Sequence, residues 1–234
     1  MARGIFITGT GTGVGKTYVA ALIAVALRKA GKRVGVYKPV ASGCERRGEE
    51  LVSPDAICLW EAAGRPRTLA EVCPQSFAAP LAPHLAARAE AKRVDPLLLR
   101  RGLEVWWETS EIVLVEGAGG LMSPLGDDDY NADLAAEFGF PLVVVSANVL
   151  GTINATLQTL ITAATYCDGL RVAGVVLNSP QQIDDQSKDS NRDELERRCV
   201  PPILAGVEFG GGVDREVNWW TLAGGREQGA GSAE

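Results

Sequence analysis

Short apolar runs alternate with longer amphipathic segments along most of the chain. Such apolar runs, bounded by glycine or polar residues, are typical of buried parallel strands. The pattern predicts strands at 5–7, 34–37, 112–115, 142–146, 172–177 and 201–206. It predicts helices at 18–30, 85–91, 97–109, 131–138, 149–167, 192–198 and 217–222, another helix that begins at 53–55, and a polar loop at 44–52. Strands that alternate with helices indicate one α/β domain, expected to span residues 1–223, with a mainly parallel sheet and a disordered tail at 224–234.

The first predicted strand leads into a glycine-rich loop, from Gly9 to Thr17, which precedes the first predicted helix. Glycines let the backbone turn tightly and bring its N–H groups against phosphate oxygens, and the helix N-terminus adds partial positive charge. Lys16 can reach the β- and γ-phosphates of a nucleotide, and the Thr17 hydroxyl can bind Mg²⁺. The order of strand, glycine loop and helix therefore predicts a phosphate-binding loop.

The spacing of this loop departs from two standard motifs. The usual phosphate-loop spacing, G-x-x-x-x-G-K-[ST], requires glycine at position 10, where this chain has Thr10. The dinucleotide-binding pattern G-x-G-x-x-G fails from either possible start, at Val14 and at Lys16. That pattern also requires an acidic residue near the end of the second strand, where this chain has Lys38. Gly-Lys-Thr at a helix start favours a phosphate loop over a dinucleotide site or a glycine turn without a ligand.

Charged and polar side chains follow two other predicted strands. Lys38 and Ser42 follow the second strand, and Glu116 directly follows the third. Ligands of open parallel sheets bind beyond the carboxyl ends of the strands, and an acidic residue there holds Mg²⁺ in phosphate-loop proteins. Asp55 lies in the first turn of a predicted helix, where it either complements the helix dipole or binds Mg²⁺. We therefore expect Lys38, Ser42 and Glu116 to lie beside the phosphate loop.

Composition narrows the classes of function. The 234 residues carry a net charge of −6 without a basic run, which argues against binding to nucleic acid or to an anionic membrane. The five cysteines are scattered without a Cys-x-x-Cys pair, so we expect no disulfide framework or zinc site and a reducing, cytoplasmic location. A single histidine, His84, excludes mechanisms or metal sites that need two.

In their order and spacing, these motifs resemble the dethiobiotin synthetase family, within the class of phosphate-loop NTPases. The resemblance rests on T-G-T-x-T-x-V-G-K-T at 8–17, Y-K-P-V-x-S-G at 37–43, Asp55, F-A-x-P-x-x-P-H at 77–84, V-E-G-A-G-G at 115–120 and L-G-x-I-N at 150–154. The family shares Thr10 in the phosphate loop. The resemblance implies a three-layer phosphate-loop fold and an ATP- and Mg²⁺-dependent ligase of biotin biosynthesis. Such an enzyme closes 7,8-diaminononanoate and CO₂ to dethiobiotin through a carbamate and a carbamic–phosphoric anhydride.

The resemblance also implies roles for individual residues. It implies catalytic roles for Thr12, Lys16 and Lys38, and Mg²⁺ ligation by Thr17, Asp55 and Glu116. The residues that it places on ATP are Gly13, Val14, Gly15, Lys16, Thr17, Tyr18, Asp55, Glu116, Gly117, Ala118, Gly119 and Asn178, with Asn178 reading adenine. The residues that it places on the diamine are Ser42, Leu150, Gly151, Thr152, Ile153 and Asn154. The helix start at 150–154 would receive the substrate carboxylate across a homodimer interface.

Some positions depart from the family, and other functions compete. Gly11 stands where family members often carry an acidic residue, and Gly13 where some do. The segment 207–212 lacks the proline often found in the adenine-binding loop. A partitioning-type ATPase would carry a signature lysine at Gly11, and a glutamine-dependent cobyrinate amidase would need an additional domain. A non-catalytic nucleotide-binding regulatory module would need neither Lys38 nor Glu116. These comparisons favour the synthetase.

Overall fold

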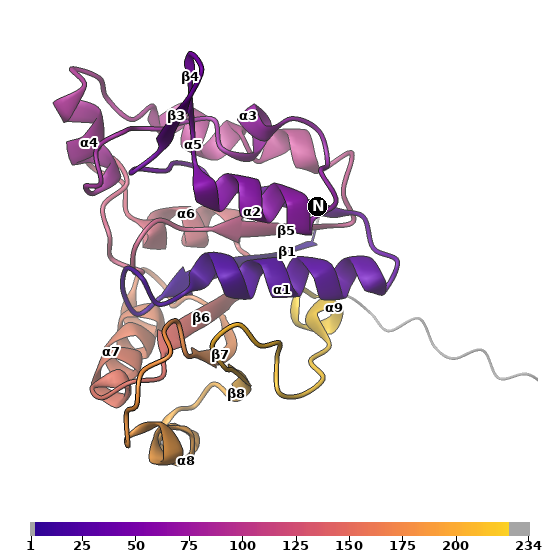
Figure 1. Ribbon diagram of the computed structural model, residues 1–234, viewed down its shortest axis with the longest axis vertical. Helices are drawn as coiled ribbons and strands as arrows, with labels where there is room; N and C mark the ends of the chain where they lie inside the picture. The colour runs from indigo at the N-terminus through magenta and orange to yellow at the C-terminus, as the bar shows by residue number, and fades with distance from the viewer. Residues whose placement is uncertain (1–2, 225–234) are drawn as a thin grey trace, which may run out of the picture.

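A six-stranded parallel sheet, in the order β2-β5-β1-β6-β7-β8, forms the centre of the computed structural model, which describes residues 3–224 (Figure 1). Its strands are β1 (Arg3–Gly9), β2 (Val34–Tyr37), β5 (Ile112–Glu116), β6 (Leu142–Ala147), β7 (Val172–Asn178) and β8 (Ile203–Val207). The predicted parallel sheet is confirmed. Apart from its first residue, the tail predicted at 224–234 lies outside the described residues.

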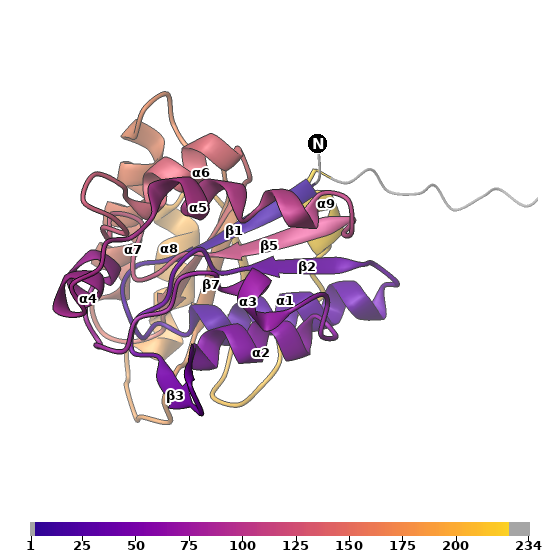
Figure 2. The same cartoon turned by 90° about the horizontal axis from the view of Figure 1, so that it is seen from above.

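Helices cover both faces of the sheet. They are α1 (Lys16–Lys29), α2 (Pro54–Ala62), α3 (Leu69–Val72), α4 (Pro83–Ala89), α5 (Pro96–Arg101), α6 (Asn131–Phe138), α7 (Thr152–Thr165), α8 (Lys188–Arg198) and α9 (Trp219–Leu222). Figure 2 shows α1, α2 and α3 on one side of the strands and α5 and α6 on the other. This is the predicted three-layer arrangement. Within residues 3–224, no helix has the length and apolar character that a membrane crossing requires.

The strand order explains where a site can form. From β1 the chain first moves outward to β2, returns to β5 between them, and then places β6 on the opposite side of β1. In register, Ile7 of β1 lies opposite Glu116 of β5, and Gly9 lies opposite Val145 of β6. Ligand sites of open parallel sheets lie at the carboxyl edge where the direction of winding reverses. The chain places its glycine loop at this point.

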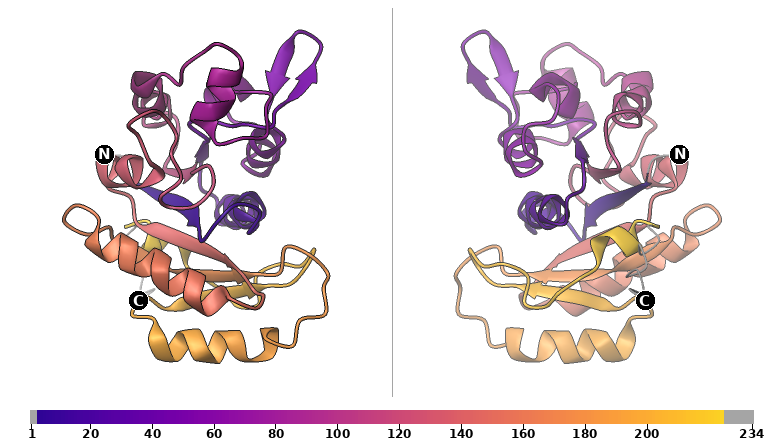
Figure 3. Two further views of the ribbon diagram at one scale, coloured as in Figure 1. Left: turned by 90° about the vertical axis from the view of Figure 1, so that its left-hand side faces the viewer. Right: turned by 90° about the vertical axis from the view of Figure 1, so that its right-hand side faces the viewer.

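The stretch predicted as a polar loop at 44–52 contains a short antiparallel hairpin. It consists of β3 (Glu45–Arg47) and β4 (Glu50–Val52), and it projects from the body of the molecule (Figure 3). Gly48 makes the tight turn with φ 64°, in the left-handed region that favours glycine. The pattern missed the hairpin because it has no buried face to impose an apolar and polar alternation.

The helix predicted at 97–109 is also shorter than expected. Helix α5 ends at Arg101, and a 3₁₀ turn, η1 (Glu104–Trp106), follows. Gly102 lies between them, and a Cβ there would lie 2.3 Å from the Tyr37 Oη. The same hydroxyl donates to the carbonyls of Leu98 and Leu99, at 2.9 and 3.0 Å. Packing against Tyr37 of the sheet therefore stops a helix that local propensity would continue.

Candidate active site

A cleft of about 520 Å³ opens at the phosphate loop, where Lys38 and Glu116 also lie. Its lining residues are Thr12, Gly13, Gly15, Lys16, Thr17, Tyr18, Lys38, Ala41, Ser42, Asp55, Glu116, Ala118, Gly119 and Pro180. All except Ala41 and Pro180 were predicted from the sequence to contact ATP, Mg²⁺ or the diamine. The fold thus gathers site residues from widely separated segments into one cleft.

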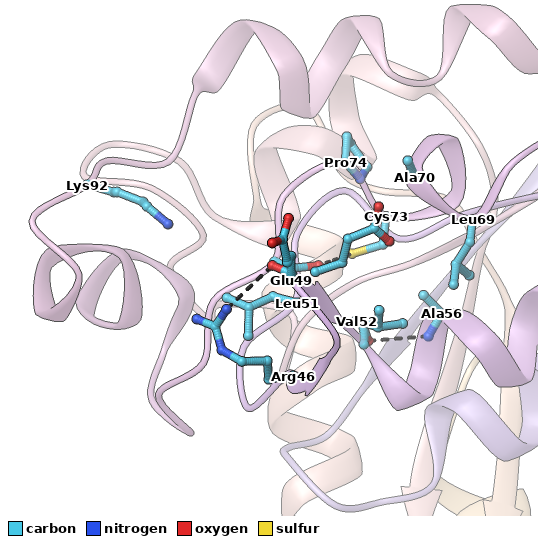
Figure 4. A pocket seen from close by; sticks show the side chains of 13 residues that line it. Arg46, Glu49, Leu51, Val52, Ala56, Leu69, Ala70, Cys73, Pro74 and Lys92 are labelled. Carbon is cyan, nitrogen blue, oxygen red and sulfur yellow. Dashed lines mark hydrogen bonds between the residues drawn. The ribbon is translucent and has the colours of Figure 1, made fainter.

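A second cavity, of about 450 Å³, lies beside the β3–β4 hairpin and α3 (Figure 4). Arg46, Leu51 and Cys73 are among the residues that line it, and Lys92 lies apart from the others in this view. No residue predicted to belong to the site lines this cavity.

The phosphate loop depends on glycines at specific positions. Gly13 and Gly15 both lie in the left-handed region, with φ 75° and 87°. A Cβ at Gly15 would lie 2.1 Å from the Asn178 Nδ2, so a larger residue does not fit without displacing Asn178. Lys16 Nζ donates to the Gly11 carbonyl at 3.0 Å, which folds the lysine back along the loop. These two glycines and the hydrogen bond of Lys16 together define the shape of the loop.

A buried lysine joins two carboxylates at the inner wall of the cleft. Lys38 Nζ lies 2.8 Å from Glu116 Oε1 and 3.0 Å from Asp55 Oδ2. Burial alone would lower the pKa of Lys38, but Glu116 and Asp55 outweigh it and raise that pKa above its ordinary value. Burial would likewise raise the pKa of the Asp55 carboxyl, but Lys38 beside it holds that pKa below its usual range. Lys38 and Asp55 are therefore charged at neutral pH.

The pKa of Lys16 is shifted in the opposite direction to that of Lys38. Its burial lowers the pKa of the ammonium group to about 8, although the Glu116 carboxylate opposes this shift. Lys38 contributes to the lowering, because it places a second positive charge nearby. Among residues 3–224, the hydrogen-bond partner of Lys16 Nζ is the Gly11 carbonyl and not a carboxylate, and a bound anion would supply a negative charge beside it.

Glu116 is the centre of the hydrogen-bonding network in the cleft. Its Oε1 accepts from Thr17 Oγ1 and from Lys38 Nζ, both at 2.8 Å. Its Oε2 is buried and has no hydrogen-bond partner among the described residues. Carboxylate and hydroxyl oxygens are the ligands that Mg²⁺ prefers, and it is bound through few protein groups when phosphates supply the rest. Thr17, Asp55 and Glu116 fit that requirement, although residues 3–224 contain no cluster of three or more His, Cys, Asp or Glu side chains arranged for a metal.

Asn131 holds the turn after Glu116, although the sequence predicted it only as the first residue of a helix. Asn131 Oδ1 accepts from the Ala118 N–H at 3.1 Å, and its Nδ2 donates to the carbonyls of Ala118 and Gly120, both at 2.7 Å. Gly117 N–H donates to the Ile7 carbonyl at 3.0 Å, which joins the turn to β1. An asparagine at the beginning of α6, in the segment that follows a glycine-rich turn, was the feature of the sequence that could have predicted this role.

Asn178 lies beneath the phosphate loop at the end of β7. It is buried, and its Nδ2 donates to the Val14 carbonyl at 2.9 Å. Its Oδ1 has no partner among the described residues. Tyr18 Oη donates to the Gly211 carbonyl at 2.8 Å, which connects α1 to the segment 207–212. The predicted adenine-contacting segments therefore lie close to the loop, with one free acceptor.

The segment that contains Ser42 is fixed by the proline-punctuated stretch at 77–84 and the residues before it. The Ala41 N–H donates to the Gln75 carbonyl, and the Phe77 N–H donates back to the Ala41 carbonyl, both at 2.9 Å. The Gly43 N–H donates to the Ala79 carbonyl at 3.1 Å. The family-like stretch at 77–84 thus supports the cleft wall from behind.

The start of α7 is built differently. Gly151 caps the helix in the left-handed region with φ 94°, and Leu150 beside it is 82% exposed. Residues 150–154 do not line the 520 Å³ cleft of this chain. Their predicted role across a homodimer interface stays a prediction.

Comparison with known proteins agrees with the fold. A family model described as an AAA domain matches residues 3–217. A protein of Pyrococcus horikoshii OT3, the septum site-determining protein MinD, shares the fold at a TM-score of 0.53 and 17% identity, covering 89% of this chain and 82% of that one. At this identity the likeness concerns the fold alone.

Two curated relatives are much more similar in sequence. The ATP-dependent dethiobiotin synthetase BioD of Rhodopirellula baltica is 43% identical over 218 residues, 88% of this chain and 84% of the relative. The protein of the same name from Anaeromyxobacter dehalogenans (strain 2CP-C) is 44% identical over 195 residues, 83% of this chain and 85% of the relative. Identity at this level across most of both chains shows that this chain belongs to the ATP-dependent dethiobiotin synthetase family.

Proposed function

We propose that this protein joins CO₂ to 7,8-diaminononanoate at the expense of ATP and closes the ureido ring of dethiobiotin. The observation that carries the proposal is Lys38, a buried ammonium held 2.8 Å from Glu116 and 3.0 Å from Asp55, beside the phosphate loop. The reaction converts a neutral amine and CO₂ into an anionic carbamate and then into a mixed anhydride. Such chemistry depends on fixed positive charge more than on a titrating base.

Lys38 supplies that fixed charge. Because Glu116 and Asp55 raise its pKa, it stays protonated throughout the neutral range and acts as an electrostatic group rather than as a base. A carbamate oxygen and a γ-phosphate oxygen that meet in front of Lys38 would share its charge as the P–O bond forms. Thr12 and Ser42, which line the same cleft, orient the carbamate and phosphate oxygens through their hydroxyls.

Lys16 and the loop amides hold the nucleotide. Phosphate oxygens beside Lys16 restore the charge that burial disfavours, so its pKa rises above about 8 when ATP binds. The amides from Gly13 to Thr17 point to the same phosphates at the start of α1. The Asn178 Oδ1, which has no hydrogen-bond partner within residues 3–224, is the acceptor assigned to the adenine amino group.

Thr17, Asp55 and Glu116 would hold Mg²⁺ with the phosphates. Within the cleft, the positive charges of Lys16 and Lys38 are balanced by the two carboxylates, so the protein alone leaves the phosphates of ATP uncompensated. When bound, Mg²⁺ supplies charge neutralisation at the β- and γ-phosphates. The free Glu116 Oε2 and the hydroxyl of Thr17 support this assignment.

The bonds balance over the full reaction. One amine loses a proton and adds to CO₂, which gives the carbamate. A carbamate oxygen attacks the γ-phosphorus, and the bond to ADP breaks. The second amine then attacks the carbonyl carbon and loses a proton, and the C–O bond to phosphate breaks. ADP, phosphate and the cyclic urea result.

We further propose that residues 1–223 form one domain and that the enzyme is a cytoplasmic homodimer. The start of α7 would then bind the carboxylate of a diamine held in the partner subunit. The αL cap at Gly151 and the exposed Leu150 beside it support such a contact. Five free cysteines support a reducing compartment.

Labelled bicarbonate tests the chemistry directly. With ATP, Mg²⁺ and the diamine, the enzyme should place the labelled carbon in the ring carbonyl in equal amount to the ADP formed, as mass spectrometry of the product would show. ATP hydrolysis without labelled product would overturn the proposal.

A further inference from the structure

The inward face of α7 is unusual at the end that faces the active-site edge. Its buried positions follow one helical stripe, Thr152, Thr156, Leu160 and Ala163. The far half of the stripe is apolar and packs against the sheet, but the near half consists of two threonines that are 3% and 0% exposed. Buried hydroxyls contribute little unless they are hydrogen-bonded. The first two turns of α7 therefore depend on the partners of these threonines.

One side chain provides both partners. Ser146, near the end of β6, is fully buried, and its Oγ lies 2.8 Å from the Thr152 Oγ1. The Thr156 hydroxyl donates to the same Ser146 oxygen, also at 2.8 Å. A third hydroxyl, that of Thr10 in the phosphate loop, lies 3.3 Å from it. Figure 1 shows α7 following β6, with the phosphate-loop helix α1 above it.

This arrangement uses the full hydrogen-bonding capacity of the Ser146 hydroxyl. Such a group donates once and accepts twice, and Thr156 already occupies one acceptor position. Ser146 can donate to Thr152 or Thr10 and accept from the other, so three neighbours satisfy it completely. One hydroxyl of the sheet thus joins the start of α7 to the phosphate loop.

The two ends of this junction are not equally dependent on Ser146. The phosphate loop has other anchors, because the Thr10 N–H donates to the Val145 carbonyl at 3.0 Å and Asn178 holds the Val14 carbonyl. The bond from Ser146 to the loop is also the longest of the three. The segment before α7 has anchors too, because the Leu150 N–H donates to Asp185 Oδ2 at 2.8 Å and Asn191 Nδ2 donates to the Val149 carbonyl at 3.3 Å. The buried hydroxyls of Thr152 and Thr156, however, both bond to Ser146, so its loss would loosen the first two turns of α7 more than the loop.

We propose that Ser146 is a positioning residue, whose hydroxyl holds the first turns of α7, and hence the amides at Gly151 to Asn154, in the orientation that receives the substrate carboxylate. This inference rests on the carboxylate role proposed above for the start of α7. Ser146 is fully buried and does not line the cleft. Its effect should appear in the use of the diamine and not in the use of ATP.

Ser146→Ala is the decisive variant, because it removes one oxygen from a buried site and adds nothing. We expect the KM for the diamine to rise about tenfold, because a buried hydrogen-bonded junction is lost, and the KM for ATP to stay within about twofold. Thr156→Val, which keeps the shape of its side chain, should raise the KM for the diamine by about threefold. This second variant decides the question if Ser146→Ala fails to fold.

Thr159→Val is the matched control on the same helix. The Thr159 hydroxyl donates to the Ala155 carbonyl of its own helix at 2.9 Å, so its loss removes a threonine hydroxyl without touching the junction. Both KM values should stay at wild-type levels. An equal rise in both KM values for Ser146→Ala would indicate general loosening and overturn the inference.

A diamine with its carboxylate replaced by an uncharged amide separates the inference from its premise. Wild-type enzyme should use the acid about tenfold better than the amide, and Ser146→Ala should nearly abolish that preference, because the α7 amides no longer meet the carboxylate. A wild-type enzyme without any preference would overturn both the carboxylate role of α7 and this inference. A wild-type preference that Ser146→Ala retains in full would overturn the inference alone.

Discussion

Helices α1 and α7 are a matched pair that the molecule uses in different ways. Each has 14 residues, follows a parallel strand, and begins after a glycine in the left-handed region without a side-chain cap. The start of α1 is surrounded by two lysines and two carboxylates. The first turns of α7 rest on the hydroxyl of Ser146, and one carboxylate, that of Asp185, accepts from the Leu150 N–H beside them at 2.8 Å. A helix N-terminus favours anions in general. The two helix starts therefore differ in their surrounding charges, in keeping with the proposal that α1 binds several phosphate groups and α7 a single carboxylate.

Lys38→Ala should produce the largest effect, because it removes the fixed charge on the α1 side. We expect turnover to fall by about 10³-fold, while nucleotide binding remains measurable through Lys16 and the loop. Steady-state kinetics and a nucleotide-binding titration check the two statements separately. Lys92→Ala is the control, since Lys92 pairs with Glu90 at 2.8 Å outside the cleft and should leave turnover intact. Unchanged turnover in Lys38→Ala would remove this residue from the mechanism.

Gly15→Ala should have the next largest effect. Its Cβ would lie 2.1 Å from the Asn178 Nδ2, in a backbone conformation that already disfavours a side chain. Displacement of Asn178 would disturb both the loop and the adenine acceptor, so ATP should bind about 100-fold more weakly, a loss of about 2.7 kcal/mol. Calorimetry measures the affinity. Gly139→Ala, at a left-handed position with open space around it, provides the control for backbone strain alone, and an equal loss in both variants would contradict the account.

The pH dependence of ATP binding tests the role of Lys16. The free enzyme holds the pKa of Lys16 at about 8, and bound phosphates raise it, so binding takes up a proton above that pH. Affinity should be greatest below this value and fall about tenfold for each further pH unit. Calorimetry in buffers of different ionisation enthalpy detects the proton. Lys16→Met should bind weakly without that proton uptake, and uptake that persists in it would assign the effect to another group.

Gly151→Ala should show the smallest effect and sharpen the contrast with Gly15. A Cβ at Gly151 meets no atom within 4 Å, so only the strain of the left-handed backbone opposes it, about 1 kcal/mol. The KM for the diamine should rise by about fivefold or less, with ATP binding unchanged. A loss as large as that of Gly15→Ala would show that the two helix starts are built alike.

The sequence alone predicted most of the α1 side and much less of the α7 side. The positions of Lys38 and Glu116 were predictable because each lies at the carboxyl end of a strand, and parallel strands end at one edge of a sheet. The roles of Asn131 and Ser146 were not, because they arise from side-chain hydrogen bonds between distant segments: Ser146 and Thr10 are 136 residues apart. The β3–β4 hairpin was missed for a different reason, namely that its strands lack a buried face. The helix break at Gly102 required knowledge that Tyr37 lies against it.

The most direct test of the account is phosphate release with and without the diamine, in the presence of bicarbonate, Mg²⁺ and ATP. In the proposed reaction the charged groups around α1 bind ATP, and the acceptor of its γ-phosphate is the carbamate, which forms only from the diamine. The account therefore predicts phosphate release that begins when 7,8-diaminononanoate is added and stops when it is consumed. Equal release without the diamine, or ATP binding without turnover when every substrate is present, would contradict it.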